Sequence, residues 1–122
     1  MPIVDIELVC APEPEITQVS AVNLADALGQ VFASPPGHTW VRLRYLDCDA
    51  YAENQSVVGT DELPVFATVL HAHLPEGDAL AVEVRAITSV LASCLARSVE
   101  RVHVQYAPAA ACRQAFGGVL VA

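Results

Sequence analysis

Pro2 is the residue of this chain whose position carries the most chemistry. Initiator methionine is normally removed before proline, which would make Pro2 the N-terminus and leave its nitrogen as a secondary amine. An α-amino group has an ordinary pKa of about 7.7–8.0, and burial lowers that pKa because it disfavours the charged form. A neutral amine could take a proton from an enol, or from a carbon beside a carbonyl, and return it elsewhere. With Met1 attached, the same nitrogen is an amide and cannot act as a base.

A structural interpretation of Pro2 stays open beside the catalytic one. Proline is tolerated at the start of an edge strand, because its missing N–H removes no hydrogen bond from the sheet there. Pro64 has no free nitrogen in either case, since it lies in the middle of the chain.

Two arginines, Arg42 and Arg44, are the candidates for binding an acidic ligand. A spacing of two residues along a strand brings both guanidinium groups to the same face. A guanidinium binds a carboxylate through two parallel hydrogen bonds and stabilises the negative charge that develops on an enolate. The alternative is an ion pair on the sheet face with Asp5 or Glu7, which contributes little where it is exposed.

The pair His71 and His73 also shares one strand face and could bind a metal together with a carboxylate. Such histidines are more often hydrogen-bonded parts of a sheet or an interface, and we expect neither a metal nor a cofactor. The cysteines are far apart and form no CxxC pair, which is typical of reduced thiols and predicts a cytoplasmic protein. They are Cys10, Cys48, Cys94 and Cys112.

The elements that position these residues can be read from the hydrophobic pattern. Residues 2–9 alternate with a period of two and predict a strand with Asp5 and Glu7 on its polar face. Pro12-Glu13-Pro14-Glu15 suits the first turn of a helix that runs to about Phe32. We expect this helix to bury Ile16, Leu24, Ala27, Leu28 and Val31. A second strand is predicted from Thr39 to Asp47.

The second half of the chain repeats this pattern. A strand is predicted from Val65 to Leu74, and Asp78 is placed to cap the helix that follows. Four apolar residues form one stripe of that helix: Val84, Ile87, Leu91 and Leu95. The last predicted strand runs from Arg101 to Tyr106.

The two halves align with an offset of about 61–63 residues, which places Pro2 on Pro64 and Arg42 on His103. We therefore expect a duplicated β-α-β unit in a single α+β domain, with a four-stranded sheet and two helices on one face. His103 either contacts an acidic substrate or packs against its neighbours. The predicted bounds are 1–122 for the domain, 2–50 and 64–107 for the repeats, and 108–122 for a C-terminal segment.

The composition limits the partners. Of the 122 residues, 54% are hydrophobic and only 16% charged, so we expect apolar surface to be buried between subunits of an oligomer. The net charge is −8, and six arginines are the only basic residues besides histidine. Nucleic acids and anionic membranes are therefore poor partners. No apolar run approaches the ~18 residues of a membrane span.

Pro2 directly after Met1, the duplicated β-α-β unit, Trp40-Val41-Arg42-Leu43-Arg44 and Phe116-Gly117-Gly118 together resemble the tautomerase superfamily. This group includes 4-oxalocrotonate tautomerase, 5-carboxymethyl-2-hydroxymuconate isomerase and macrophage migration inhibitory factor. The resemblance implies a homotrimer whose sheets form a barrel, with active sites near the subunit boundaries. It also implies that Pro2 is the general base and acid, that Arg42 grips the substrate carboxylate, and that Phe116 walls the pocket. Arg44 and His103 are further candidates for contacting the substrate.

The chain also departs from the family pattern. Neither strand-to-helix turn carries the arginine that many members have there, and Ala115 stands where the dehalogenating branch has an acid. Hydration and dehalogenation are therefore not expected. The sequence predicts an isomerase that moves a proton on a small keto or enol carboxylic acid. Two alternatives stay open: decarboxylation of a β-keto acid, and a non-catalytic trimeric binding or structural protein.

Overall fold

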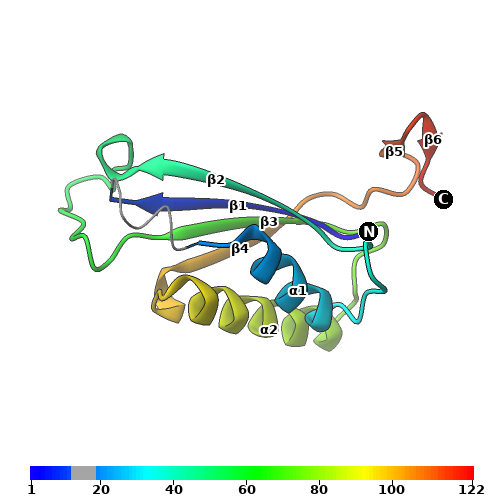
Figure 1. Cartoon of the computed structure of the whole chain (residues 1–122), viewed down its shortest axis with the longest axis horizontal. Helices are drawn as coiled ribbons and strands as arrows, with labels where there is room; N and C mark the ends of the chain where they lie inside the picture. The colour runs from blue at the N-terminus through cyan, green and yellow to red at the C-terminus, as the bar shows by residue number, and fades with distance from the viewer. Residues whose placement is uncertain (12–18) are drawn as a thin grey trace.

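The computed structural model describes residues 1–11 and 19–122. In this part of the chain a four-stranded sheet is covered on one face by two helices, and a small hairpin projects from the body (Figure 1). The helices and strands are β1 (Ile3–Cys10), α1 (Ala21–Val31), β2 (Trp40–Asp47), β3 (Val65–Leu70), α2 (Asp78–Leu95), β4 (Val102–Tyr106), β5 (Ala115–Phe116) and β6 (Val119–Leu120).

The sheet has the strand order β2-β1-β3-β4. β1 pairs with β2 in parallel, β3 pairs with β4 in parallel, and the antiparallel pair of β1 and β3 joins the two halves. Each parallel pair is linked by one helix, because parallel neighbours need a long crossover connection. The α+β fold with two β-α-β units and two helices on one face is therefore confirmed.

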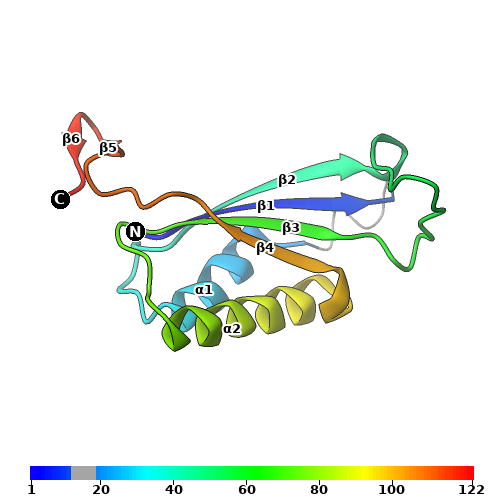
Figure 2. The same ribbon diagram turned by 180° about the vertical axis from the view of Figure 1, so that it is seen from behind.

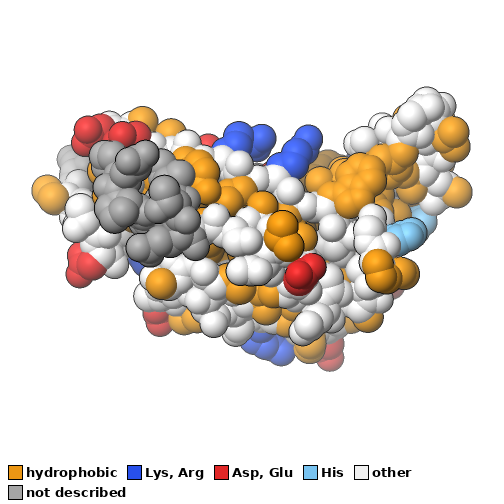
Figure 3. Space-filling view, viewed as in Figure 1, with side chains coloured by type: hydrophobic (Ala, Val, Ile, Leu, Met, Phe, Trp, Pro, Cys, Tyr) orange, Lys and Arg blue, Asp and Glu red, His pale blue; other side chains and the backbone are white. Residues whose placement is uncertain are grey.

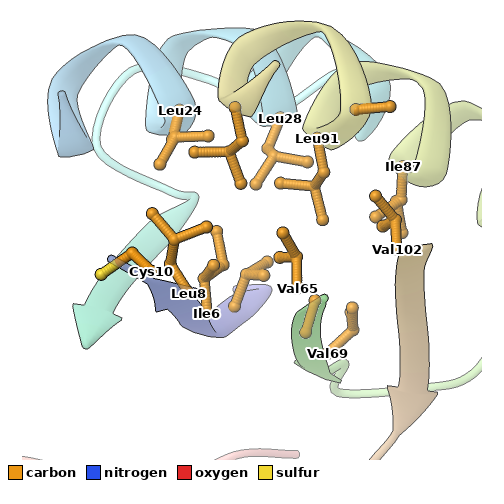
Figure 4. Packing of buried hydrophobic residues seen from close by; sticks show 14 residues of the cluster. Ile6, Leu8, Cys10, Leu24, Leu28, Val65, Val69, Ile87, Leu91 and Val102 are labelled. Atoms are coloured by element: carbon orange, nitrogen blue, oxygen red, sulfur yellow. The ribbon is translucent and has the colours of Figure 1, made fainter. Parts of the chain in front are cut away.

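The core lies between the sheet and the helices (Figure 4). Alternation along β1 directs Val4, Ile6 and Leu8 toward the helices, and all three are fully buried. They pack with Leu24 and Leu28 of α1, with Val65, Ala67 and Val69 of β3, and with Ile87, Leu91 and Leu95 of α2. Fully burying an aliphatic side chain of this size contributes about 1.5–3 kcal/mol, so this face fixes the register of the sheet.

The first helix begins later than the sequence predicted. It starts at Ala21 because Ser20 is its N-cap, and the Oγ of Ser20 accepts a hydrogen bond from the backbone N–H of Asn23 at 3.2 Å. Leu24 and Leu28 are buried as predicted. The prediction for Pro12-Glu13-Pro14-Glu15 and Ile16 concerns residues outside those that the structure describes.

Two predictions at the start of the second crossover were wrong. β3 ends at Leu70 rather than at Leu74, because its partner β1 begins at Ile3 and these two residues form the last pair. Asp78 is the first residue of α2 and not its cap, which is Gly77 in a conformation with φ +55°. The carboxylate of Asp78 still lies in the first turn, where the helix dipole favours it.

The C-terminal segment leaves the body after β4 and ends in the hairpin β5–β6 (Figure 2). Phe116 pairs with Val119, so Gly117 and Gly118 form the two-residue turn. Both have positive φ, +57° and +88°, as a type I′ turn requires. None of the described helices is long and apolar enough to cross a membrane.

Candidate active site

Pro2 is buried at the end of the sheet where β1 and β2 begin. Its carbonyl oxygen accepts a hydrogen bond from the backbone N–H of Trp40 at 3.1 Å. This bond ties the N-terminus to the first residue of β2. Pro2 is thus held in a defined place, as a proton-transfer group must be.

Phe116 lies at the same end of the sheet, where its ring contacts the ring of Trp40. The two rings meet edge to face, with centroids 5.0 Å apart and an interplanar angle of 79°. The indole Nε1–H of Trp40 donates to the carbonyl oxygen of Gly37 at 2.9 Å, which fixes the indole ring. Because the backbone N–H of Trp40 also binds the Pro2 carbonyl, the aromatic pair lies at the end of the sheet that carries Pro2.

Arg42 lies on the open face of the sheet, away from the helices, directly opposite Asp5 in register. Its Nε donates to Asp5 Oδ1 at 2.5 Å and its Nη2 donates to Asp5 Oδ2 at 2.8 Å. The hydrogen bond from Arg42, with smaller contributions from the charges of Arg42 and Arg44, lowers the pKa of the Asp5 carboxyl despite its partial burial. The ion pair that the sequence left as an alternative is therefore formed.

The geometry of this pair shows what Arg42 can do. Its guanidinium makes the forked, two-bond contact that recognises a carboxylate, and Asp5 supplies that carboxylate. The side chain of Arg42 is 65% exposed, so solvent screens the pair and its contribution to stability is small. Basic side chains stand above β2 on the side away from the helices, as Figure 3 shows. Arg44 lies opposite Glu7 in register on this face.

His103 belongs to the other half of the open face. Its ring lies 5.5 Å from that of Phe66, and both residues line a shallow cavity of about 270 Å³. Thr68 and Gln105 line it too, joined by a 2.9 Å hydrogen bond from the amide of Gln105 to the hydroxyl of Thr68. This cavity offers an imidazole, an amide and an aromatic face to a small ligand.

The five residues singled out from the sequence fall into two groups. Pro2 lies at one end of the sheet, and Phe116 lies at the same end against Trp40. Trp40 alternates with Val41 and so shares the open face with Arg42 and Arg44, and His103 lies on the other half of that face. Alternation along the strand directs the ring of Pro2 to the helix-covered side together with Val4, whereas the guanidinium of Arg42 lies on the open face. A single chain therefore does not assemble the complete set.

A polar cluster that the sequence did not reveal lies on the helix-covered side. Glu83 Oε2 accepts a hydrogen bond from the hydroxyl of Tyr106 at 2.8 Å and lies 2.9 Å from Nε2 of His71. The imidazole stacks on the ring of Tyr106, at 6.0 Å and 15°, and meets the edge of Phe32 at 5.3 Å. Burial, and next the hydrogen bond to Glu83, raise the pKa of Tyr106, so its hydroxyl stays a donor.

The prediction that the two histidines share a strand face was wrong: both follow the end of β3 at Leu70, and they have different partners. His71 binds Glu83, whereas His73 contacts the carbonyl oxygen of Ala122 at 3.1 Å. Glu83 was missed because carboxylates on a helix usually face solvent. One signal was present: Glu83 lies four residues before Ile87, on the stripe of α2 that faces the sheet.

Comparison with known proteins supports the fold. No family model and no curated protein matches the sequence. A macrophage migration inhibitory factor from Oncomelania hupensis superposes with a TM-score of 0.73 at 18% identity, over 100% of this chain and 83% of that one. Pt0534 inactivated by 2-oxo-3-pentynoate gives 0.72 at 15% identity, over 97% and 94% of the two chains. A fused 4-OT, described as a symmetric trimer, gives 0.67 at 12% identity, over 86% and 83%.

At these identities the likeness is one of fold. The structures that match are macrophage migration inhibitory factors and a fused 4-OT, so the fold expected from the resemblance to the tautomerase superfamily is confirmed. These two matches cover 100% and 97% of this chain, and 83% and 94% of the other chains.

Proposed function

We propose that this protein of the tautomerase fold is an isomerase that moves a proton on a small keto or enol carboxylic acid. The amine of Pro2, freed by removal of Met1, is the general base and then the general acid. The observation that carries the proposal is the position of Pro2: it is buried directly before β1, and its carbonyl is hydrogen-bonded to the backbone of Trp40, at the end of the sheet that also carries the Trp40–Phe116 pair.

The reaction needs only one base, because substrate and product are isomers. The neutral amine takes the proton of an enol hydroxyl, and the electron pair left on oxygen forms the carbonyl. The double-bond electrons move to carbon, which takes the proton back from the ammonium of Pro2. A guanidinium that binds the carboxylate also stabilises the negative charge of the intermediate enolate.

We propose a homotrimer in which a neighbouring chain completes the site. Pro2 and Phe116 of one chain would meet Arg42, Arg44 and His103 on the open face of another. Two features support this assembly: the open face carries its own charged and aromatic side chains, and large apolar groups are exposed outside the core. These groups are Trp40 (50% exposed), Val119 (72%) and Leu120 (61%).

The class of substrate follows from two observations. The forked contact that Arg42 makes with Asp5 is the contact that a substrate carboxylate would make in its place. Pt0534, which shares the fold, is inactivated by 2-oxo-3-pentynoate, an acid with a keto group next to its carboxylate. A small 2-keto acid or its enol therefore fits the site best.

Two other functions have a specific observation in their favour. Asp5 already occupies the guanidinium of Arg42, which favours a non-catalytic binding or structural protein. The carboxylate of Glu83 lies beside His71 on the helix-covered side, the side to which the ring of Pro2 is directed. A carboxylate there would favour the cationic Pro2 that a β-keto acid decarboxylase uses to polarise a carbonyl. Both alternatives assume the same trimer. The binding or structural protein would turn over no substrate, whereas the decarboxylase would turn over a β-keto acid.

The test is turnover of phenylenolpyruvate and 2-hydroxymuconate by the native protein, after intact mass has shown that Met1 is absent. Pro2→Ala leaves a primary amine that is more mobile and less well placed, so we expect a loss of about 10²-fold in kcat/KM with little change in stability. Equal turnover by both proteins across pH 5–9 would rule out the proline mechanism.

A further inference from the structure

We propose that the cluster of His71, Glu83 and Tyr106 sets the protonation state of the Pro2 amine, with Glu83 as its anion and His71 as the positioning residue between them. This inference rests on the proposed function in one respect, which is that Met1 is removed. Two groups, Nε2 of His71 and the hydroxyl of Tyr106, meet at one oxygen, Glu83 Oε2, and the side chains of His71 and Glu83 are only 13% and 15% exposed.

The register of the sheet places His71 beside Pro2. β1 and β3 are antiparallel and their last pair is Ile3 with Leu70, so the next pair in this register is Pro2 with His71. Directly opposite residues have Cβ atoms about 4.5–5.5 Å apart and point to the same face. That face is the helix-covered one, because Val4 and Val69 form the pair two positions away and are both fully buried. Figures 1 and 2 both show the N-terminus beside the chain that leaves β3.

The hydrogen bonds to Glu83 determine how the imidazole is oriented. An ionised carboxylate only accepts, so the Nε2 of His71 carries the proton in this contact. In the neutral ring, Nδ1 then keeps its lone pair, and no hydrogen bond to it is formed by any of the described residues. A protonated secondary amine has two N–H groups to donate. An Nδ1 acceptor next to Pro2, backed by the charge of Glu83, therefore favours the charged amine.

The other groups around Pro2 do not cancel this effect. On the helix-covered side lie the uncharged Phe32, which caps the end of α1, and the hydroxyl of Tyr106 from β4. Thr39 directly precedes β2, and its hydroxyl binds Ser34 at 2.6 Å.

The charged side chains of the neighbouring strands do not face Pro2 from the helix-covered side. Arg42 and Arg44 face the opposite side of the sheet, and Asp5 partly neutralises them. His73 is turned toward Ala122. Glu83 is the formal charge of this cluster, and His71 links it to the end of the sheet that carries Pro2. Its negative charge opposes the effect of burial on the amine. Glu76 and Asp78, exposed where the chain enters α2, add charge of the same sign and therefore do not cancel it.

The experiment is an NMR titration of the ¹⁵N-labelled Pro2 amine in protein shown by intact mass to lack Met1. Glu83→Gln keeps the shape of the side chain and removes its charge. We expect this variant to lower the pKa of the Pro2 amine by about 1, the low end of the shift that a nearby opposite charge produces. Glu62→Gln removes the same charge at the other end of the sheet and should leave the amine unchanged.

An unchanged amine pKa in folded Glu83→Gln, or an equal change in Glu62→Gln, would overturn the inference. If Glu83→Gln does not fold, His71→Phe decides: it keeps the ring stack, removes the acceptor, and should lower the pKa of the amine too. The titration needs no turnover. A protein that is inactive on keto acids but shows the shift refutes the proposed function and supports this inference. If Met1 is retained in the native protein, the proposed function fails, and the titration is done after treatment with methionine aminopeptidase.

Discussion

At the residue scale, an enzyme and a non-catalytic protein differ in whether a substrate carboxylate can replace Asp5 on Arg42. The guanidinium is held in carboxylate-binding geometry by a carboxylate that belongs to the same sheet. A substrate would have to compete with Asp5, and it can do so because the pair is exposed and weak. Asp5 would then keep Arg42 extended and oriented between turnovers.

This interpretation predicts the effect of substitutions at Arg42. Arg42→Ala should raise KM for an acidic substrate about 10- to 150-fold, which corresponds to the loss of a charged hydrogen bond of about 1.5–3 kcal/mol. Arg42→Lys should recover part of the affinity, because an ammonium cannot make the forked contact. Steady-state kinetics measures both.

Arg85→Ala is the matched control, since Arg85 lies exposed on α2 and away from the open face. If Arg42 only forms an ion pair with Asp5 and does not bind substrate, Arg42→Ala would lower the melting temperature and leave KM unchanged. That result would contradict the role of Arg42 in binding.

The residues differ in how far the sequence could reveal their roles. The possible partners of Arg42 were predictable because Asp5, Glu7 and the two arginines lie on the polar faces of neighbouring strands. The contact of Glu83 with His71 and Tyr106 was not, because it depends on how far α2 is rotated above the sheet. No local pattern fixes that rotation.

At the element scale, the strands were predicted well because burial on one face imposes a period of two. β2 and β4 each begin one residue later than expected. The larger errors concern the first residue of α1 and the last residue of β3. The end of β3 is set by where β1 begins, and the start of α1 by the cap at Ser20, so neither follows from hydrophobic periodicity alone.

The hairpin β5–β6 is the element on which assembly should depend, because it carries Phe116 and exposes Val119 and Leu120. Gly118→Val places a β-branched residue at φ +88°, which costs on the order of 1–2 kcal/mol. We expect the turn to open and the trimer to dissociate at about 10-fold higher protein concentration.

Gly117→Asn is the control for this prediction, because asparagine followed by glycine is a preferred type I′ turn. Light scattering over a dilution series compares the two variants with the native chain. Equal dissociation of Gly118→Val and Gly117→Asn would show that the hairpin does not hold the assembly together.

At the scale of the whole molecule, the duplication gave part of the topology. The repeat predicted two β-α-β units in one sheet but not which strands join them. The units join at their first strands, which gives the order β2-β1-β3-β4. The division of chemistry between the two faces could not be predicted, because it depends on which chain faces which in an assembly. The proposed site therefore needs more than one chain.

Light scattering of the native protein tests directly whether several chains assemble. We expect a trimer of 12.9 kDa chains at micromolar concentration, because a monomer would leave the open face and the projecting hairpin uncovered. A mass of 12.9 kDa at that concentration would contradict the assembly and with it the completion of the site by a neighbour.

The central claim is that the amine of Pro2 is free and reactive, and 2-oxo-3-pentynoate tests it most directly. The nucleophilic amine would add to the triple bond conjugated with the keto group, so the protein gains the mass of one reagent molecule and no group leaves. We predict loss of activity together with one adduct, located on Pro2 by peptide mass spectrometry. Pro2 found unmodified, whether because Met1 is still attached or because the reagent labels another residue, would contradict the account.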